Sequence, residues 1–219
     1  MGDLAVASLA GAVAVPLGLV IALLIRCTMG GPVIFRQTRT GRDGREFQIL
    51  KFRTMRDRRF TEEEDAPRIT RIGALLRKTS LDELPQLWNV ARGDMGIIGP
   101  RPTLPEQVVH YSPRQRGRLA VRPGLTGWAQ VSGRNSISWP ERIDLDLWYI
   151  ANRSLLLDLK ILARTVKVLL RPQGITAAGG VNPGFPAPTE LPVQRVVLPR
   201  QATASRLTTQ PVRAVEEAS

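Results

Sequence analysis

The chain has 219 residues, of which 31 are Lys or Arg and 19 are Asp or Glu, so its formal net charge is +12. Such a basic chain predicts an anionic partner, which could be nucleic acid, lipid headgroups or a phosphate-bearing substrate. One cysteine, Cys27, excludes an internal disulfide and a multi-thiolate zinc site, and one histidine, His110, excludes a His-rich metal site. Acid–base or nucleophilic chemistry would therefore fall mainly to carboxylates, lysines, tyrosines or hydroxyls.

An uncharged run rich in Ala, Val and Leu extends from Leu4 to Ile25. As a straight helix it would measure about 33 Å, close to the thickness of a bilayer core. No Lys or Arg precedes it, which argues against a signal peptide, and the Arg-rich sequence after it predicts a cytoplasmic body. Pro16 near the middle of the run would kink a helix. Residues 1–28 are therefore predicted to be a membrane anchor that either spans the bilayer or enters one leaflet and returns.

Two runs rich in β-branched and aromatic residues, 33–38 and 47–53, flank a turn that contains Asp43-Gly44. Asp-Gly between two such runs is a strong hairpin signal. Lys51 lies in the second run. It is either a point-charge ligand for phosphate or an exposed strand lysine.

An amphipathic basic helix is predicted over residues 69–78. Apolar residues recur there at helical spacing with arginines between them. Such a helix fits the headgroup layer of a membrane, and it fits the surface of a soluble core equally well.

Residues 79–83, Thr-Ser-Leu-Asp-Glu, place two adjacent carboxylates, Asp82 and Glu83, at a predicted helix start. Ser80 and Glu83 have the spacing of a capping box, in which each side chain binds a free backbone N–H. Asp82 would then complement the helix dipole. In an enzyme acting on phosphates, the same two carboxylates are the first candidates for covalent or metal chemistry.

The remaining chain predicts an α+β fold that is mostly helical. We expect a short helix over 84–90, a loop over 93–102, helical structure within 104–119, a turn at 123–127 and one or two helices over 139–171. Beyond residue 171 the sequence is rich in Pro, Ala, Thr and Gln without periodicity. Residues 172–219 are therefore predicted to be a disordered tail.

Three arginines, Arg101, Arg122 and Arg134, lie beside glycine or proline in predicted loops. Such backbone lets an Arg fork approach a phosphate closely, although any one of them could simply bind nearby carbonyls. Asp146 belongs to an Asp-x-Asp pattern that is only a weak metal signal.

Several motifs follow one another in a specific order: Gly31-Pro32-Val33-Ile34-Phe35-Arg36-Gln37, Lys51-Phe52-Arg53-Thr54-Met55, Thr79-Ser80-Leu81-Asp82-Glu83-Leu84-Pro85-Gln86, Gly93-Asp94-Met95, Gly99-Pro100-Arg101-Pro102, Arg122-Pro123-Gly124-Leu125-Thr126-Gly127-Trp128-Ala129-Gln130-Val131 and Gly133-Arg134-Asn135. Together they resemble the bacterial sugar transferase family, the monotopic phosphoglycosyl transferases, from about residue 3 to 171. Family members usually carry basic residues and an aromatic before the acid that matches Asp3, and longer relatives carry a multi-span N-terminal region. This sequence instead begins Met1-Gly2-Asp3, and it is expected to be a minimal catalytic form.

The resemblance implies that residues 29–171 form a catalytic domain on the cytoplasmic face of the plasma membrane. This domain would transfer a sugar-1-phosphate from a nucleoside diphosphate sugar, expected to be a UDP-sugar, to polyprenyl (undecaprenyl) phosphate. This transfer would release UMP and would initiate a membrane-linked glycan or exopolysaccharide. The resemblance also implies interfacial amphipathic helices and a re-entrant anchor helix broken at Pro16.

The family's site residues map onto this chain by motif. Asp82 matches the covalent nucleophile, and Glu83 matches the acid that holds Mg²⁺ against the diphosphate. Lys51, Arg77, Arg101 and Arg134 match positions around the phosphates, and Asp146 matches a family acid of less defined role. A helix start would keep Asp82 ionised, as a carboxylate nucleophile requires.

Two other functions remain compatible with the residues alone. A membrane-tethered module could bind anionic lipid or nucleic acid through its arginines without turnover. Aromatic residues make up only 5% of the chain, which is thin for single-strand binding by stacking, and the leading prediction includes no nucleic acid. A nucleotide-sugar hydrolase would consume donor without forming a lipid product.

Overall fold

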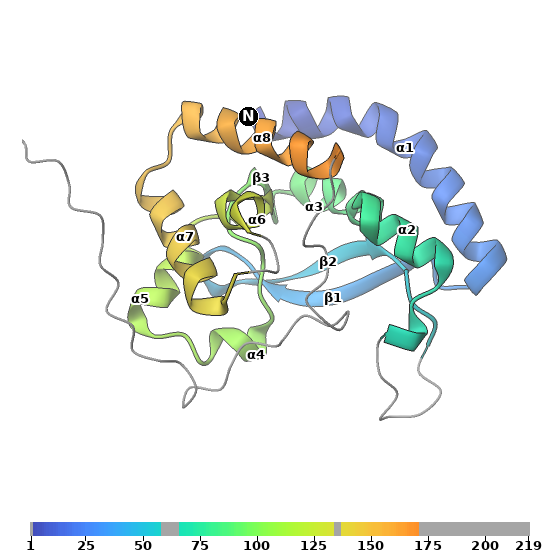
Figure 1. Ribbon diagram of the computed structural model, residues 1–219, viewed down its shortest axis with the longest axis horizontal. Helices are drawn as coiled ribbons and strands as arrows, with labels where there is room; N and C mark the ends of the chain where they lie inside the picture. The colour runs from blue at the N-terminus through green and yellow to red at the C-terminus, as the bar shows by residue number, and fades with distance from the viewer. Residues whose placement is uncertain (1, 58–65, 134–136, 171–219) are drawn as a thin grey trace, which may run out of the picture.

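The computed structural model describes residues 2–57, 66–133 and 137–170. These residues form eight α-helices and two small two-stranded sheets, which agrees with the predicted α+β class. Figure 1 shows a long central hairpin, β1–β2, with helices around it and with α1 and α8 along one edge of the molecule. Arg134 and the predicted tail at 172–219 lie outside the described residues.

Helix α1, Gly2–Met29, continues through Pro16. Its axis changes direction between the two ends (Figure 1), as expected where a proline removes a backbone hydrogen bond. Within the described part of the chain, no helix combines the length and apolar character needed to cross a membrane.

The C-terminal half of α1 packs against the body of the protein. Ile21 and Ile25 are 4% and 0% exposed, and they form a cluster with Phe52 and Leu76. Other apolar side chains of the same half are exposed: Val15, Leu17, Leu19, Val20, Leu23 and Leu24. The helix therefore has one face in the core and an apolar face outside it.

Strands β1, Ile34–Thr40, and β2, Glu46–Phe52, pair antiparallel with Ile34 opposite Phe52. The turn contains a short 3₁₀ segment, η1, Arg42–Gly44, in which Asp43 and Gly44 have φ values of 57° and 78°. Asp and Gly tolerate this left-handed region. The predicted hairpin is confirmed.

Helix α2, Arg71–Thr79, follows a second 3₁₀ segment, η2, Ala66–Arg68. Thr70 caps α2 by accepting a hydrogen bond from the Gly73 backbone N–H at 3.0 Å. A Cβ on Gly73 would lie 1.9 Å from the Thr54 carbonyl oxygen, so only glycine lets α2 lie directly on the backbone that follows β2. The predicted basic helix is confirmed.

Helix α2 leads through the 3₁₀ turn η3, Leu81–Glu83, into α3, Gln86–Arg92. The side chain of Asn89, which is 1% exposed, docks α3 on the hairpin. Its Nδ2 donates to the Gln48 carbonyl at 2.8 Å and its Oδ1 accepts from the Leu50 N–H at 3.1 Å. This amide replaces a neighbouring strand at the edge of β2 and fixes the position of η3 beside it.

A second sheet lies where a loop and a turn were predicted. Strand β3, Gly96–Ile98, pairs in parallel with β4, Gly124–Thr126. The prediction of loop over 93–102 was wrong here, because three-residue strands carry too little sequence pattern to stand out. A Cβ on Gly124 would lie 2.1 Å from the Gly99 nitrogen, so this close pairing depends on glycine.

The remaining described elements are helical and pack in two small clusters. The elements are α4, Pro105–Val108; α5, Pro113–Arg116; the 3₁₀ turn η4, Gly117–Ala120; α6, Trp128–Ser132; α7, Trp139–Ala151; and α8, Leu155–Leu170. Ile143 of α7 packs with Val108 and Tyr111, and Tyr149 packs with Leu157 and Ile161.

Candidate active site

The two adjacent carboxylates lie in η3, where the chain turns from α2 into α3. Ser80 ends α2 in the left-handed conformation with φ 59°, and its N–H donates to the Arg77 carbonyl at 3.3 Å. The capping box predicted for Ser80 and Glu83 is wrong, because a capping serine needs extended backbone and the Ser80 side chain makes no cap hydrogen bond. Ser80 ends α2 and its carbonyl accepts a hydrogen bond from the Glu83 N–H at 3.2 Å, but its side chain does not cap η3, so the Glu83 carboxylate binds other partners.

Glu83 is the centre of an ion cluster drawn from three elements. Lys51 Nζ of β2 and Arg101 Nη2 each donate to Glu83 Oε1 at 2.7 Å. Arg101 Nη1 lies 3.5 Å from Oε2. Burial favours a higher pKa for Glu83, but the charges and hydrogen bonds of Arg101 and Lys51 lower it well below its usual range. Glu83 is therefore ionised at any physiological pH.

Asp82 has a different environment from its neighbour. Its side chain is buried, and its carboxylate accepts no hydrogen bond within the described part of the chain. Burial raises the pKa of Asp82, and the charge of Glu83 raises it further, while Lys51, Arg101 and Arg77 oppose the shift. Burial in a short 3₁₀ turn thus shifts the pKa of Asp82 in the direction opposite to that expected from a helix dipole.

Three of the predicted phosphate-binding cations surround this pair. Burial lowers the pKa of Lys51, and the adjacent Glu83 opposes that shift. Arg77 Nε donates to the Thr54 hydroxyl at 2.9 Å, which fixes the guanidinium at the end of β2. Lys51, Arg77 and Arg101 all act electrostatically on Asp82. Such a group of cations around an unpaired carboxylate suits a substrate that carries several phosphate oxygens.

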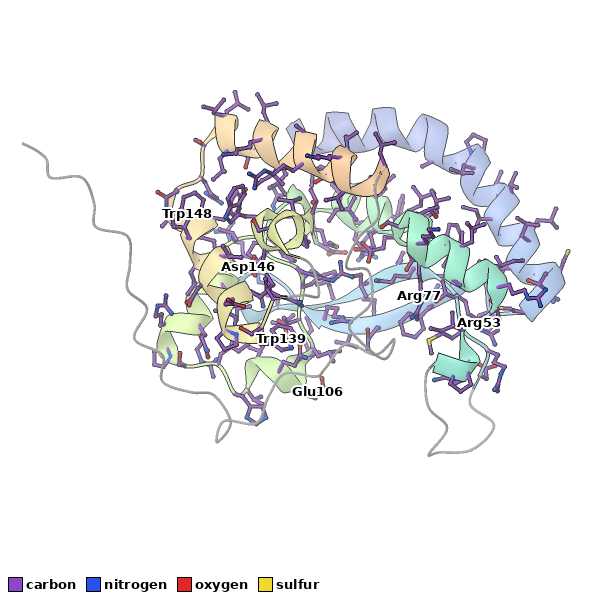
Figure 2. The ribbon with its side chains drawn as sticks, in the orientation of Figure 1. Arg53, Arg77, Glu106, Trp139, Asp146 and Trp148 are labelled. Atoms are coloured by element: carbon purple, nitrogen blue, oxygen red, sulfur yellow. The ribbon has the colours of Figure 1, made fainter. Side chains whose placement is uncertain are left out.

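Asp146 is not part of this group. It is 1% exposed in α7, and Arg118 Nε donates to its Oδ2 at 2.6 Å. Figure 2 shows Asp146 on α7 and Arg77 on α2 well apart from one another. The structure thus separates Asp146 from the two carboxylates, while Arg118 links it to the Arg101 backbone, where Nη2 donates to the carbonyl at 3.0 Å.

Two functional candidates, Arg39 and Arg118, were not among the residues predicted from the sequence. Burial and the Arg101 charge lower the pKa of Arg39 to about 10, although Glu83 opposes this shift. Arg39 therefore lies within electrostatic reach of the site from β1. Arg39 has no Gly or Pro neighbour, and Arg118 follows Gly117 but lies in the stretch predicted to contain helix rather than in a predicted loop. Only the fold brings these two near Arg101.

The donor groups present can be compared with the needs of a divalent cation. Among the residues that the structure describes, no three His, Cys, Asp or Glu side chains converge. Mg²⁺ needs only one or two protein carboxylates when substrate phosphates supply further oxygens. Asp82 and Glu83 supply two, so the residues fit Mg²⁺ bound together with a diphosphate. Asp82 has the less engaged oxygens, because Glu83 already binds Lys51 and Arg101.

The fold thus brings two carboxylates together with Lys51, Arg77 and Arg101, and comparisons with known proteins identify the family of the chain. Residues 1–172 match the family model described as bacterial sugar transferase. The chain is 48% identical over 162 residues to the uncharacterized sugar transferase EpsL of Bacillus subtilis (strain 168), which covers 73% of this chain and 80% of EpsL. The chain belongs to the bacterial sugar transferase family, and the resemblance seen in its motifs is confirmed.

Two further relatives have more specific names. The UDP-glucose:undecaprenyl-phosphate glucose-1-phosphate transferase of Caulobacter vibrioides (strain ATCC 19089 / CIP 103742 / CB 15) is 46% identical over 186 residues, covering 77% of this chain and 68% of that protein. The UDP-galactose-lipid carrier transferase of Erwinia amylovora is 42% identical over 176 residues, covering 71% of this chain. This chain spans only 37% of the Erwinia protein.

Proposed function

We propose that this chain transfers a sugar-1-phosphate from a UDP-sugar to undecaprenyl phosphate or another polyprenyl phosphate. The observation that carries the proposal is the unequal carboxylate pair. Asp82 is buried without a hydrogen-bond partner among the described residues, whereas Glu83 is held by Lys51 and Arg101. The name of the Caulobacter relative supports both proposed substrates.

In the proposed reaction, Asp82 is the nucleophile. A carboxylate oxygen of Asp82 attacks the donor phosphorus that carries the sugar. The bond from that phosphorus to the bridging oxygen of the diphosphate breaks, and UMP leaves with the bridging oxygen. The polyprenyl phosphate oxygen then attacks the phosphorus of the aspartyl phosphosugar, which releases Asp82. Covalent catalysis lets a soluble donor and a lipid acceptor use one site in turn.

The surrounding cations would bind the phosphate oxygens. Lys51, Arg77 and Arg101 would neutralise charge that develops on the transferring phosphoryl group. Arg101 offers a bidentate fork, whereas Lys51 is a point charge. Glu83 keeps both Lys51 and Arg101 in place before substrate binds. Arg134 is part of the same proposal, although it lies outside the described residues.

We include Mg²⁺ in the proposal, with Glu83 as its predicted ligand and the adjacent Asp82 as a second oxygen source. Bound with the diphosphate, Mg²⁺ would supply charge neutralisation at the phosphate oxygens. Chelation with EDTA is expected to stop UMP release, and added Mg²⁺ to restore it. Activity that survives exhaustive chelation would remove Mg²⁺ from the proposal.

We also propose that the chain lies on the cytoplasmic face of the plasma membrane with α1 and α8 against lipid. Helix α8 buries Leu157 and Ile161 but exposes Leu155 and Leu156 to 76% and 79%. Further exposed apolar residues on α8 are Leu159, Leu162, Val166, Leu169 and Leu170. Figure 1 places α8 and α1 along the same edge.

The basic residues of α8 support this orientation. Arg164 and Lys160 lie 4.8 and 5.6 Å from the ring centre of Trp128, which belongs to α6. These cations thus contact the body of the protein while leucines face outward. In a helix that only covers a soluble core, the apolar face is expected inward and the charges outward. On α8, exposed apolar side chains accompany the buried Leu157 and Ile161. A lipid surface explains the exposed ones, since exposed apolar patches of this kind mark interaction sites.

The proposed function is tested with Asp82→Asn, a donor panel and polyprenyl phosphate in membranes. Wild-type protein is expected to release UMP rather than GMP and to form a sugar-diphospholipid, and Asp82→Asn to do neither while remaining folded. Donor consumption without a lipid product would indicate a hydrolase. Full activity of Asp82→Asn would exclude the covalent step.

A further inference from the structure

Arg101 lies in a short segment in which each carbonyl oxygen accepts a hydrogen bond from a different residue. Pro100 and Pro102 flank it, so φ is fixed at both neighbours and the backbone before each proline is restricted to extended conformations. The four carbonyls from 100 to 103 accept hydrogen bonds from Gly124 N at 2.9 Å, Arg118 Nη2 at 3.0 Å, Arg39 Nη1 at 3.4 Å and Thr40 N at 2.9 Å. The peptide carbonyl of Arg101 itself thus depends on a side chain, that of Arg118.

Arg118 is placed to hold this carbonyl rigidly. It is 3% exposed, and its three guanidinium nitrogens have three different acceptors. Nε donates to Asp146 at 2.6 Å, Nη1 to the Tyr111 hydroxyl at 2.6 Å and Nη2 to the Arg101 carbonyl. Asp146 and Tyr111 are 1% and 4% exposed. The fork therefore has no freedom to turn without losing a buried partner.

Stability alone does not account for this arrangement. A buried ion pair costs desolvation, and its replacement by apolar side chains is often neutral or stabilising. The carbonyl that Arg118 holds belongs to the residue whose guanidinium contacts Glu83 Oε1 at 2.7 Å. The buried pair is therefore connected to the active site through Arg101.

We propose that Arg118, oriented by Asp146 and Tyr111, is a positioning residue that sets the direction in which Arg101 reaches the carboxylate pair. This inference rests on the proposed function, in which Arg101 binds donor phosphate. The inference gives Asp146 an indirect role. Asp146 contacts neither carboxylate in η3, but it orients the Arg118 guanidinium, which in turn holds the Arg101 backbone. Tyr111 has the same role through its hydroxyl.

The test uses Arg118→Lys in the full chain. A lysine keeps a charge for Asp146, so the fold is retained, but it lacks the fork that reaches Tyr111 and the Arg101 carbonyl together. A displacement of about 1 Å in a positioned group costs up to about 100-fold in rate. We expect kcat/KM for the UDP-sugar to fall about 10- to 100-fold in protein that remains folded, with a lower Tm because two buried hydrogen bonds are lost.

The matched control is Arg114→Lys. Arg114 forms an exposed pair with Asp144 on α7 at 2.6 Å, with side chains 57% and 28% exposed. This pair is chemically the same as Arg118–Asp146 but has no bond to the Arg101 segment. Arg114→Lys is expected to retain wild-type kcat/KM.

The decisive measurement repeats Arg118→Lys in an Arg101→Lys background. If Arg118 acts through Arg101, the Arg118→Lys substitution lowers kcat/KM in the wild-type background and has little further effect in the Arg101→Lys background. An equal fold-loss in both backgrounds would overturn the inference. Donor binding by Asp82→Asn protein gives a readout without turnover: adding Arg118→Lys should weaken UDP-sugar binding about tenfold, and unchanged binding would count against the positioning role. Absence of UMP release from wild-type protein would instead refute the proposed function.

Discussion

Lys51 Nζ lies 2.7 Å from Glu83 Oε1, and this ion pair joins the second hairpin strand to the turn that follows α2. Arg101 binds the same oxygen from a third segment. The next carboxylate along the chain, that of Asp82, accepts no hydrogen bond in the part of the chain that the structure describes. One acid is thus held ionised, and burial pushes the other toward protonation. Carboxylates whose pKa values diverge in this way have different roles in catalysis.

Asp82→Asn is predicted to stabilise the protein while abolishing turnover. The folded pKa of Asp82 is raised, so its stabilising contribution is present at low pH and is lost as pH rises through that pKa. Asparagine mimics the neutral form at every pH. At pH 7 the variant should therefore be more stable than wild type and have a higher Tm. Thermal unfolding in detergent checks this, and the gain should shrink toward pH 4.

The acid limb of the pH–rate profile is predicted to follow Asp82. The nucleophile must be ionised, so kcat/KM should fall as pH drops through a pKa above that of an ordinary aspartate. The Arg77 charge lowers the pKa of Asp82, so Arg77→Met should move the limb to higher pH. Arg77→Lys, which keeps the charge, should move it less. An acid limb that stays in place in Arg77→Met would show that another group is titrating.

Glu83→Gln is predicted to destabilise the fold as well as impair turnover. Glutamine cannot neutralise Lys51 and Arg101, whose charges would then repel one another in a half-buried cluster. We expect a loss of about 1–3 kcal/mol at pH 7. The folded pKa of Glu83 is lowered, so its stabilisation is present above the unfolded pKa and is lost as pH falls toward the folded one.

Denaturant unfolding at several pH values checks this second stability effect. The difference between wild type and Glu83→Gln should be constant from pH 6 to 8 and should narrow below about pH 4.3, the ordinary glutamate value. A difference that grows on acidification would contradict the assignment of Glu83 as the ionised partner.

The outer face of α8 is predicted to contact lipid. A nitroxide attached to Leu156→Cys should be more accessible to oxygen than to a water-soluble nickel reagent in vesicles. The label requires a Cys27→Ser background, because Cys27 is the single cysteine and is exposed. A label at Arg114→Cys, on an exposed part of α5, is the control and should show the opposite preference. Equal accessibility of the two labels to oxygen and to the nickel reagent would contradict lipid contact by α8.

The sequence allowed the local elements to be predicted, but not the contacts between them. The hairpin and α2 were predicted because turn chemistry and helical spacing are local properties. The parallel pair β3–β4 was missed, since each strand is short and is stabilised by a partner far away in the chain.

The carboxylate pair itself was found from its motif, yet its environment was misjudged. Ser80 has a left-handed backbone, which an apparent capping motif does not reveal. Arg118 was missed because its importance comes from three tertiary partners that lie 7, 17 and 28 residues away in the sequence. Motif order pointed to the two carboxylates, whereas burial and tertiary contacts shift the pKa of each acid in its own direction.

The packing of β2 has a consequence for how the enzyme meets its lipid acceptor. Consecutive strand residues point to opposite sides, and here Phe52 packs on Ile21 and Ile25 of α1 while Lys51 binds Glu83. One peptide unit, about 3.3 Å of strand, thus separates the anchor contact from the site. With α1 resting in lipid as proposed, β2 fixes the height of Lys51 relative to the membrane surface. Any substitution that lets α1 sink or rise would carry Lys51 with it and change the height at which a headgroup phosphate must arrive.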